Sequence, residues 1–101
     1  MGRAEGKVED YLRRRVREEG GTIRKFRWIG RRGAADNLVW FTFPNVALVE
    51  CKAEGKDTDP RSQQARDLRR MREARWPVYA VSSREEVDEL LARMRVKEMF
   101  R

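Results

Sequence analysis

The sequence predicts an α/β domain in which a mixed central sheet is flanked by helices. Apolar residues recur at helical spacing near both ends of the chain, in 5–19 and 83–94, and short apolar segments of strand length lie between them. A turn at 44–45 joins two of these segments as an antiparallel hairpin, whereas the last strand is reached through a helical crossover. At 101 residues, the chain is expected to form one domain over 1–101.

The first helix is predicted from Glu5 to Glu19, where the sequence Gly20-Gly21 ends it. Its buried stripe is formed by Val8, Tyr11, Leu12 and Val16. Glu5 and Glu9 both lie beside this stripe, so the helical wheel does not decide which of them turns inward. A first strand is expected from Thr22 to Trp28.

Two apolar strands, 37–43 and 46–52, are predicted to pair across the turn Pro44-Asn45. If the turn contained only these two residues, Asp36 and Glu50 would lie on opposite faces. A three-residue turn or a bulge returns them to one face, with Leu38 opposite Glu50 and Asp36 opposite Lys52. Two acids that share one ion therefore require an odd-length connection or a bulge.

The stretch 46–52 ends an apolar strand with Glu50 and Lys52 on one face and Cys51 on the other. We expect Cys51 to be a small buried residue rather than a catalytic thiol. Charges at such a position are costly unless they are paired, and a metal ion or a substrate phosphate would pair with them. A plain salt bridge between the two side chains is the alternative.

A second helix is predicted to open at Asp59-Pro60, with the aspartate as N-cap. Gln64 lies on its apolar face, so its amide points inward and either satisfies a backbone carbonyl or serves a nearby site. The opposite face carries four arginines, and this face is either solvated or lies along a duplex: Arg66, Arg69, Arg70 and Arg72.

The last elements are a short buried strand over 77–81 and a helix that opens with a capping box from Ser83 to Glu86. The tail 96–101 contains the apolar residues Met99 and Phe100. Such a tail either frays or meets a partner subunit.

The net charge and the counts of cysteine and histidine limit the classes of function that the chain can have. The formal net charge is +7, which favours a phosphate-rich partner, although solubility alone explains many basic domains. The chain has one cysteine and no histidine, so an internal disulfide, a zinc site and a histidine base are excluded. It shows no signal peptide or membrane span, and we expect a cytoplasmic setting.

Several motifs, taken in order, resemble the VRR-NUC family of virus-type replication-repair nucleases in the PD-(D/E)xK superfamily. They are Glu9 before Leu12, Gly20-Gly21 followed by Lys25, the loop 30–36 that ends in Asp36, Glu50-Cys51-Lys52, Gly55-Lys56 and Gln64. The chain departs from the family pattern at three places: Ala35 replaces a proline, Cys51 an aliphatic residue and Arg75 a glycine. The resemblance implies a restriction-endonuclease-like core.

The resemblance implies a catalytic set of Asp36, Glu50, Lys52, Glu9 and Gln64, with Glu9 rather than Glu5 as the helical acid. Mg²⁺ or Mn²⁺ suits such an all-oxygen site. We expect Asp36, Glu50 and the Cys51 carbonyl to bind the ion, while Glu9 holds either a water on that ion or a second ion. Lys52 would orient or deprotonate the attacking water. Gln64 would orient this lysine or the water.

Four basic residues near these motifs are expected to contact DNA phosphates: Lys25, Arg31, Arg32 and Lys56. Small stand-alone members of the family resemble phage-type Holliday-junction resolvases, which act as homodimers. The resemblance thus implies a metal-dependent DNA endonuclease that selects branched DNA and comes from a phage or a bacterium. The alternative is a catalytically silent, basic nucleic-acid-binding module.

Overall fold

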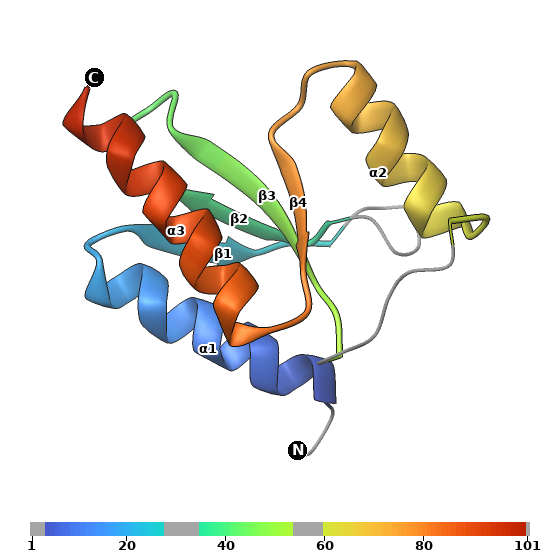
Figure 1. The fold of residues 1–101 in the computed structure, drawn as a ribbon, viewed down its shortest axis with the longest axis horizontal. Helices are drawn as coiled ribbons and strands as arrows, with labels where there is room; N and C mark the ends of the chain where they lie inside the picture. The colour runs from blue at the N-terminus through green and yellow to red at the C-terminus, as the bar shows by residue number, and fades with distance from the viewer. Residues whose placement is uncertain (1–3, 28–34, 54–59, 101) are drawn as a thin grey trace.

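Four strands form one mixed sheet in the computed structural model of the chain, which describes residues 4–27, 35–53 and 60–100 (Figure 1). They lie in the order β1-β2-β3-β4. Their bounds are Thr22–Lys25, Asn37–Trp40, Val46–Cys51 and Val78–Val81. The first three strands pair antiparallel, and β4 joins β3 in parallel. The predicted mixed sheet with a hairpin and a crossover strand is therefore confirmed.

Helices cover both faces of this sheet (Figure 1). The helices α1, Ala4–Glu18, and α3, Arg84–Met99, pack on one face. There they bury the larger core, which includes Leu12, Val39 and Leu91. The helix α2, Gln63–Glu73, packs on the other face against a smaller core around Leu48 and Leu68. The two faces therefore carry different cores, and the ends of the strands lie between them.

The local signals that end α1 and begin α3 act largely as predicted. Gly20 follows α1 with a φ of 85°, a left-handed conformation that favours glycine. The Ser83 hydroxyl caps α3 by accepting a hydrogen bond from the Glu86 N–H at 3.1 Å. The reciprocal half of the capping box differs, because the Glu86 carboxylate accepts from the Ser82 N–H and hydroxyl instead.

The start of α2 differs from the prediction. Ser62, not Asp59, is the N-cap, because its hydroxyl accepts a hydrogen bond from the Ala65 N–H at 3.1 Å. Pro60 lies in the preceding turn, and Asp59 is outside the described residues. The sequence offers two capping residues in succession, and the one nearer the buried Leu68 begins the helix.

The hairpin has a connection with an odd number of residues, as predicted, but the pairing of its two strands differs from the prediction. Leu38 pairs with Leu48 rather than with Glu50, a shift of two residues that keeps the faces unchanged. The shift arises because β2 ends at Trp40 and not at 43. The five residues 41–45 form the connection, and the Phe41 N–H donates to the Asn45 carbonyl across it at 3.0 Å.

The first strand is also shorter than predicted, because β1 ends at Lys25. Phe26 continues the contact with one backbone hydrogen bond, from its N–H to the Asp36 carbonyl at 2.9 Å. Trp28, where the strand was expected to end, lies outside the described residues. The paired segments of the antiparallel strands are therefore only four residues long, and Asp36 adjoins them.

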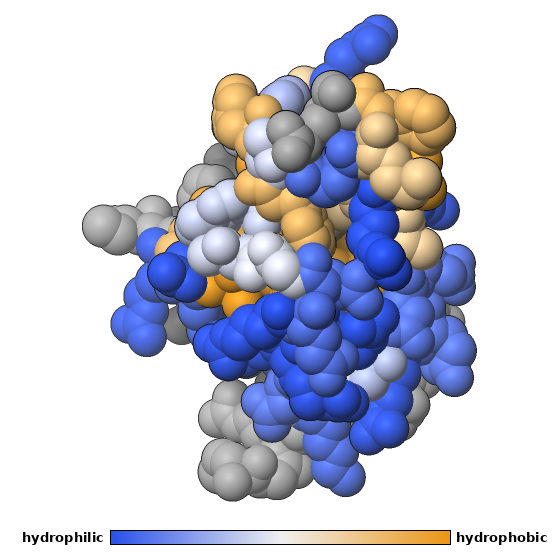
Figure 2. All heavy atoms as spheres, turned by 90° about the vertical axis from the view of Figure 1, so that its left-hand side faces the viewer, coloured by the Kyte–Doolittle hydropathy of each residue, from blue (hydrophilic) through white to orange (hydrophobic). Residues whose placement is uncertain are grey.

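Apolar side chains gather at the end of the molecule formed by the β2–β3 connection and the last turn of α3 (Figure 2). Phe43, Met99 and Phe100 are 82%, 76% and 80% exposed. Glu98 joins the two segments, because it accepts hydrogen bonds from the Thr42 N–H and hydroxyl. In the described part of the chain, no helix has the length and apolar character needed to span a membrane.

Candidate active site

A polar cleft of about 400 Å³ lies beside the carboxyl end of β3. It is lined by Gly6, Glu9, Lys25, Asp36, Glu50, Cys51, Lys52 and Gln64. The catalytic residues expected from the sequence, Glu9, Asp36, Glu50, Lys52 and Gln64, all line it. Residues that are far apart in the chain thus meet in one pocket.

The sheet brings Asp36 and Glu50 to the same end and the same face. Asn37 pairs with Val49, so the same register continued by one residue places Asp36 opposite Glu50. The Glu50 and Lys52 side chains are 14% and 21% exposed, and the Lys52 Nζ lies 4.0 Å from Glu50 Oε2. Because this ion pair is long and both side chains are largely buried, the Lys52 ammonium is able to interact with a further anion.

Glu9 reaches the cleft from α1, on the other face of the sheet. Its carboxylate accepts hydrogen bonds from Asn37 Nδ2 at 2.9 Å and from Lys25 Nζ at 3.2 Å. Burial raises the pKa of Glu9, but these hydrogen bonds and the positive charges of Lys25 and Arg13 outweigh it, so the net pKa is lowered. Glu9 is therefore held as a carboxylate. The side chain of Glu5, the alternative helical acid, lies outside the described part of the structure.

Asn37 is a site residue that the sequence reasoning missed. It is fully buried, and its Nδ2 donates to Glu9 Oε2 and, at 3.2 Å, to Asp36 Oδ1. One amide thereby links the acid from α1 to the acid before β2. The available signal was a polar residue at a position of β2 that points into the larger core, where burial requires a polar partner.

Asp36 lies in a less favourable environment than Glu9. Burial raises the pKa of Asp36, the ammonium of Lys25 opposes this change, and the negative charge of Glu9 adds to it. The net pKa lies above the ordinary value. Lys25 Nζ is 3.9 Å from Asp36 Oδ2, so this lysine stands between the two acids. The charge of Asp36 is incompletely balanced, a state that a cation would relieve.

Cys51 has the surroundings of a structural residue. Its side chain packs against the larger core, on the face opposite Glu50 and Lys52. Burial, together with the charges of Glu9, Glu50 and Asp36, raises the pKa of its thiol to about 12. The nucleophilic thiolate is therefore disfavoured near neutral pH.

The other predicted site residues fall into two groups. Gln64 faces the cleft from the first turn of α2, and it is less exposed than its neighbour Gln63, as predicted. Arg31, Arg32 and Lys56 lie outside the described residues.

Among the residues that are described, no three acidic or cysteine side chains are arranged to hold a metal ion directly.

The element order and the placement of Asp36, Glu50 and Lys52 at one end of a mixed sheet define a nuclease core of the PD-(D/E)xK class. A solved structure described as a VRR_NUC domain has the same fold, with a TM-score of 0.78 and 34% sequence identity. The match covers 90% of this chain and 97% of that one. The chain belongs to the VRR-NUC family of nucleases. No family model and no curated protein matches the sequence.

Proposed function

We propose that the chain is a divalent-metal-dependent DNA endonuclease that selects branched DNA in the manner of a Holliday-junction resolvase. The observation that carries this proposal is the single cleft in which Asp36, Glu50 and Lys52 meet Glu9 and Gln64. The net charge of +7 supports DNA as the substrate, because a basic protein attracts a polyanion.

Mg²⁺ or Mn²⁺ fits the donors of this cleft. Asp36 and Glu50 offer carboxylate oxygens, which these hard cations prefer, and the raised pKa of Asp36 marks a charge that a cation would stabilise. Asp36, Glu50 and the Cys51 carbonyl would hold the ion. Glu9 would hold either a water on that ion or a second ion. When bound, the ion would activate water and offset charge on the scissile phosphate.

Lys52 is proposed as the catalytic base or electrophile of the cleft. Its ammonium is sheltered from solvent and only loosely paired with Glu50. As an ammonium, Lys52 would orient the attacking water and stabilise the negative charge that develops on the pentavalent phosphate, whereas its neutral amine would be the form that deprotonates this water. Gln64, which faces the same cleft, would orient the lysine or the water through its amide.

A homodimer is proposed because the described residues of one domain gather the expected catalytic side chains in one cleft, whereas resolving a junction requires two cuts. The exposed apolar end of the molecule, with Phe43, Met99 and Phe100, supports a contact between copies (Figure 2). Light scattering should give twice the monomer mass if the chain forms this dimer.

The test is a cleavage assay on a labelled four-way junction beside a flap, a linear duplex and a single strand, each with Mg²⁺, Mn²⁺ or EDTA. We expect cleavage of the junction with either metal and none in EDTA. Asp36→Ala and Lys52→Ala proteins should be inactive, and turnover by either at the parent rate would refute the proposed roles.

One observation favours a second function, a catalytically silent DNA-binding module. Lys25 already contacts Glu9 at 3.2 Å and lies 3.9 Å from Asp36, so an ammonium partly neutralises these acids. The same assay separates the two functions. A silent module would bind DNA equally well in EDTA and would cut no substrate with any metal.

A further inference from the structure

A second groove, of about 520 Å³, lies at the other end of β4 from the catalytic cleft. It is formed by the last turn of α2, the connection to β4, the start of β4 and one residue of α3. Three arginines and two aromatic residues line it: Arg72, Arg75, Arg93, Trp76 and Tyr79. Because β4 is an outer strand of the sheet, the groove opens at the side of the molecule.

The arginines of this groove are available to bind an anion. Within the described residues, Arg75 and Arg93 have no carboxylate within ion-pair distance, and no acidic residue lines the groove. Arg72 uses only its Nε, which donates to the Val78 carbonyl at 3.4 Å and directs the guanidinium towards β4. Arg14 and Arg15 on α1, in contrast, pair with Glu18. Three guanidinium groups around one hollow suit phosphate oxygens.

Two features of the connection before β4 are unfavourable in the chain by itself. Trp76 is 56% exposed, so a large apolar ring faces water. Arg75 has a φ of 68°, a left-handed conformation that costs an L-residue about 1–2 kcal/mol. Strained backbone often marks a functional position. Here the strained residue contributes a cation and directly precedes the exposed aromatic ring.

We propose that this groove binds an unpaired DNA strand, with phosphates on Arg72, Arg75 and Arg93 and a base stacked on Trp76. The combination of cations with an exposed aromatic ring is typical of single-strand binding, because every base has a face that stacks. A duplex offers its phosphates but keeps its bases stacked on one another. The inference rests on the proposed function, since it gives the proposed nuclease a site for nucleotides that become unpaired where the arms of a branched substrate meet.

The parallel pairing of β3 and β4 connects the groove to the cleft. Val78 in the groove pairs with Leu48, and Lys52 of the cleft lies four residues further along the same direction. At about 3.3 Å per residue, the two sites are roughly 13 Å apart along the strand. A few nucleotides would span this distance, so one strand of a branched substrate reaches both sites.

The test measures binding of a fluorescent oligothymidine by anisotropy in EDTA, where no cleavage interferes. Trp76→Ala should weaken binding by about 5- to 100-fold, which corresponds to one stacked base, and Trp76→Phe should restore most of it. Arg93→Ala and Arg75→Gly should each weaken binding and reduce its salt dependence by about one phosphate contact. The Arg75 change also relieves backbone strain, so it is expected to fold.

Arg17→Ala is the matched control, because it removes an exposed arginine of α1 that does not line the groove. This variant should bind the oligonucleotide as the parent does. The proposal is overturned if Trp76→Ala binds as tightly as the parent, or if Arg17→Ala weakens binding as much as Arg93→Ala does.

Cleavage of a four-way junction by the same proteins separates this inference from the proposed function. If the parent cuts nothing but Trp76→Ala still loses affinity for the single strand, the nuclease proposal fails and the groove stands. If the parent cuts the junction and Trp76→Ala binds and cuts equally well, the groove is refuted and the nuclease stands.

Discussion

Asn37 shows how one buried amide organises the cleft. Because its Nδ2 holds the Glu9 and Asp36 carboxylates together, Asn37→Ala should lower junction cleavage by about 10- to 100-fold, as the loss of supporting residues does at other metal sites. Affinity for DNA in EDTA should change little, because the arginine-lined surfaces are untouched. Single-turnover kinetics at saturating enzyme would measure this difference.

Asn45→Ala is the matched control, since Asn45 is also buried but its Nδ2 binds the Met94 carbonyl at 2.8 Å, away from the cleft. Both changes should lower the free energy of unfolding by about 1–3 kcal/mol, because each breaks a buried hydrogen bond. Only Asn37→Ala should slow cleavage by folded protein. Equal rates for the two variants would show that Asn37 is merely structural.

The family resemblance suggested a glycine near position 75, and Arg75 has the left-handed backbone conformation that favours glycine. Arg75→Gly should therefore raise the free energy of unfolding by about 1 kcal/mol relative to Arg75→Ala, which removes the same charge but keeps the strain. Urea denaturation of the two variants measures the difference. Equal stability would mean that the conformation carries no strain.

The sequence predicts the residues of the cleft better than their interactions. The spacing of Glu50 and Lys52 on a strand placed both on one face, and family motifs singled out Glu9 and Gln64. Asn37 escaped notice because its partner Glu9 comes from a helix 28 residues earlier, and a single sequence does not reveal which polar residue will meet it.

At the scale of elements, hydrogen bonds to Glu98 join the β2–β3 connection to α3. Its carboxylate accepts hydrogen bonds from the Thr42 N–H, the Thr42 hydroxyl and Asn45 Nδ2, at 2.9–3.0 Å. Glu98→Ala should lower the free energy of unfolding by about 1–3 kcal/mol, because these donors lose a charged acceptor. Lys97→Ala, an exposed neighbour, should change it by less than about 0.5 kcal/mol. Thermal unfolding that is indistinguishable for the two would contradict this tether.

Elements with a long periodic pattern were predicted well, and short ones were not. The apolar stripes fixed α1 to within one residue at each end and located the start of α3, because each turn repeats the signal. The end of α3 was not predicted, since the helix continues to Met99 through most of the segment expected as a tail. The strands β1 and β2 are shorter than predicted, since Phe26 and Phe41 are apolar but lie just beyond the strand ends. Tertiary contacts, not propensity, decide where such strands stop.

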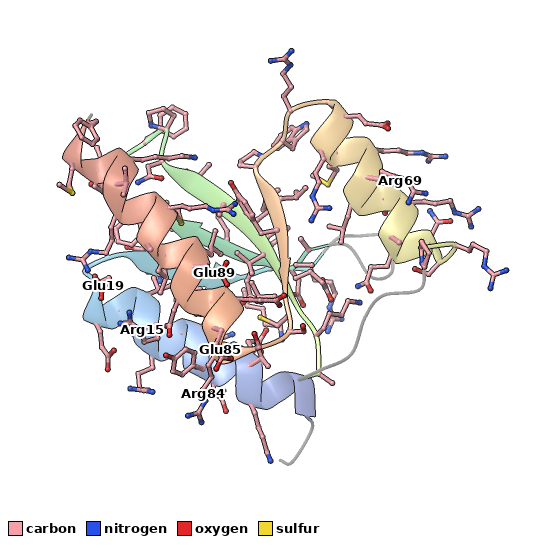
Figure 3. The ribbon with its side chains drawn as sticks, in the orientation of Figure 1. Arg15, Glu19, Arg69, Arg84, Glu85 and Glu89 are labelled. Atoms are coloured by element: carbon pink, nitrogen blue, oxygen red, sulfur yellow. The ribbon has the colours of Figure 1, made fainter. Side chains whose placement is uncertain are left out.

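At the scale of the whole molecule, charge is distributed unevenly about the sheet. Arg69 extends from α2 on one face, whereas Glu85 and Glu89 lie on α3 on the other (Figure 3). Arg66 and Arg69 are exposed residues of α2, the helix whose first turn carries Gln64 to the cleft. We expect DNA to approach from the α2 side, where its phosphates meet cations.

Arg69→Ala should therefore weaken binding to every DNA substrate and lower the salt dependence by about one phosphate contact. Arg84→Ala is the control, because Arg84 lies at the acidic start of α3 (Figure 3). The measurement is a salt titration of junction affinity in EDTA. Equal slopes for the two variants would place the DNA elsewhere.

We propose that Asp36 and Glu50, brought together by the hairpin register, hold a cation that makes the cleft catalytic. Glu50→Gln keeps the shape of the side chain and removes its charge, so the rate of junction cleavage in Mg²⁺ tests the claim most directly. We predict a loss of at least about a hundredfold, more than a supporting residue would cause. Cleavage by Glu50→Gln at the parent rate would contradict the account.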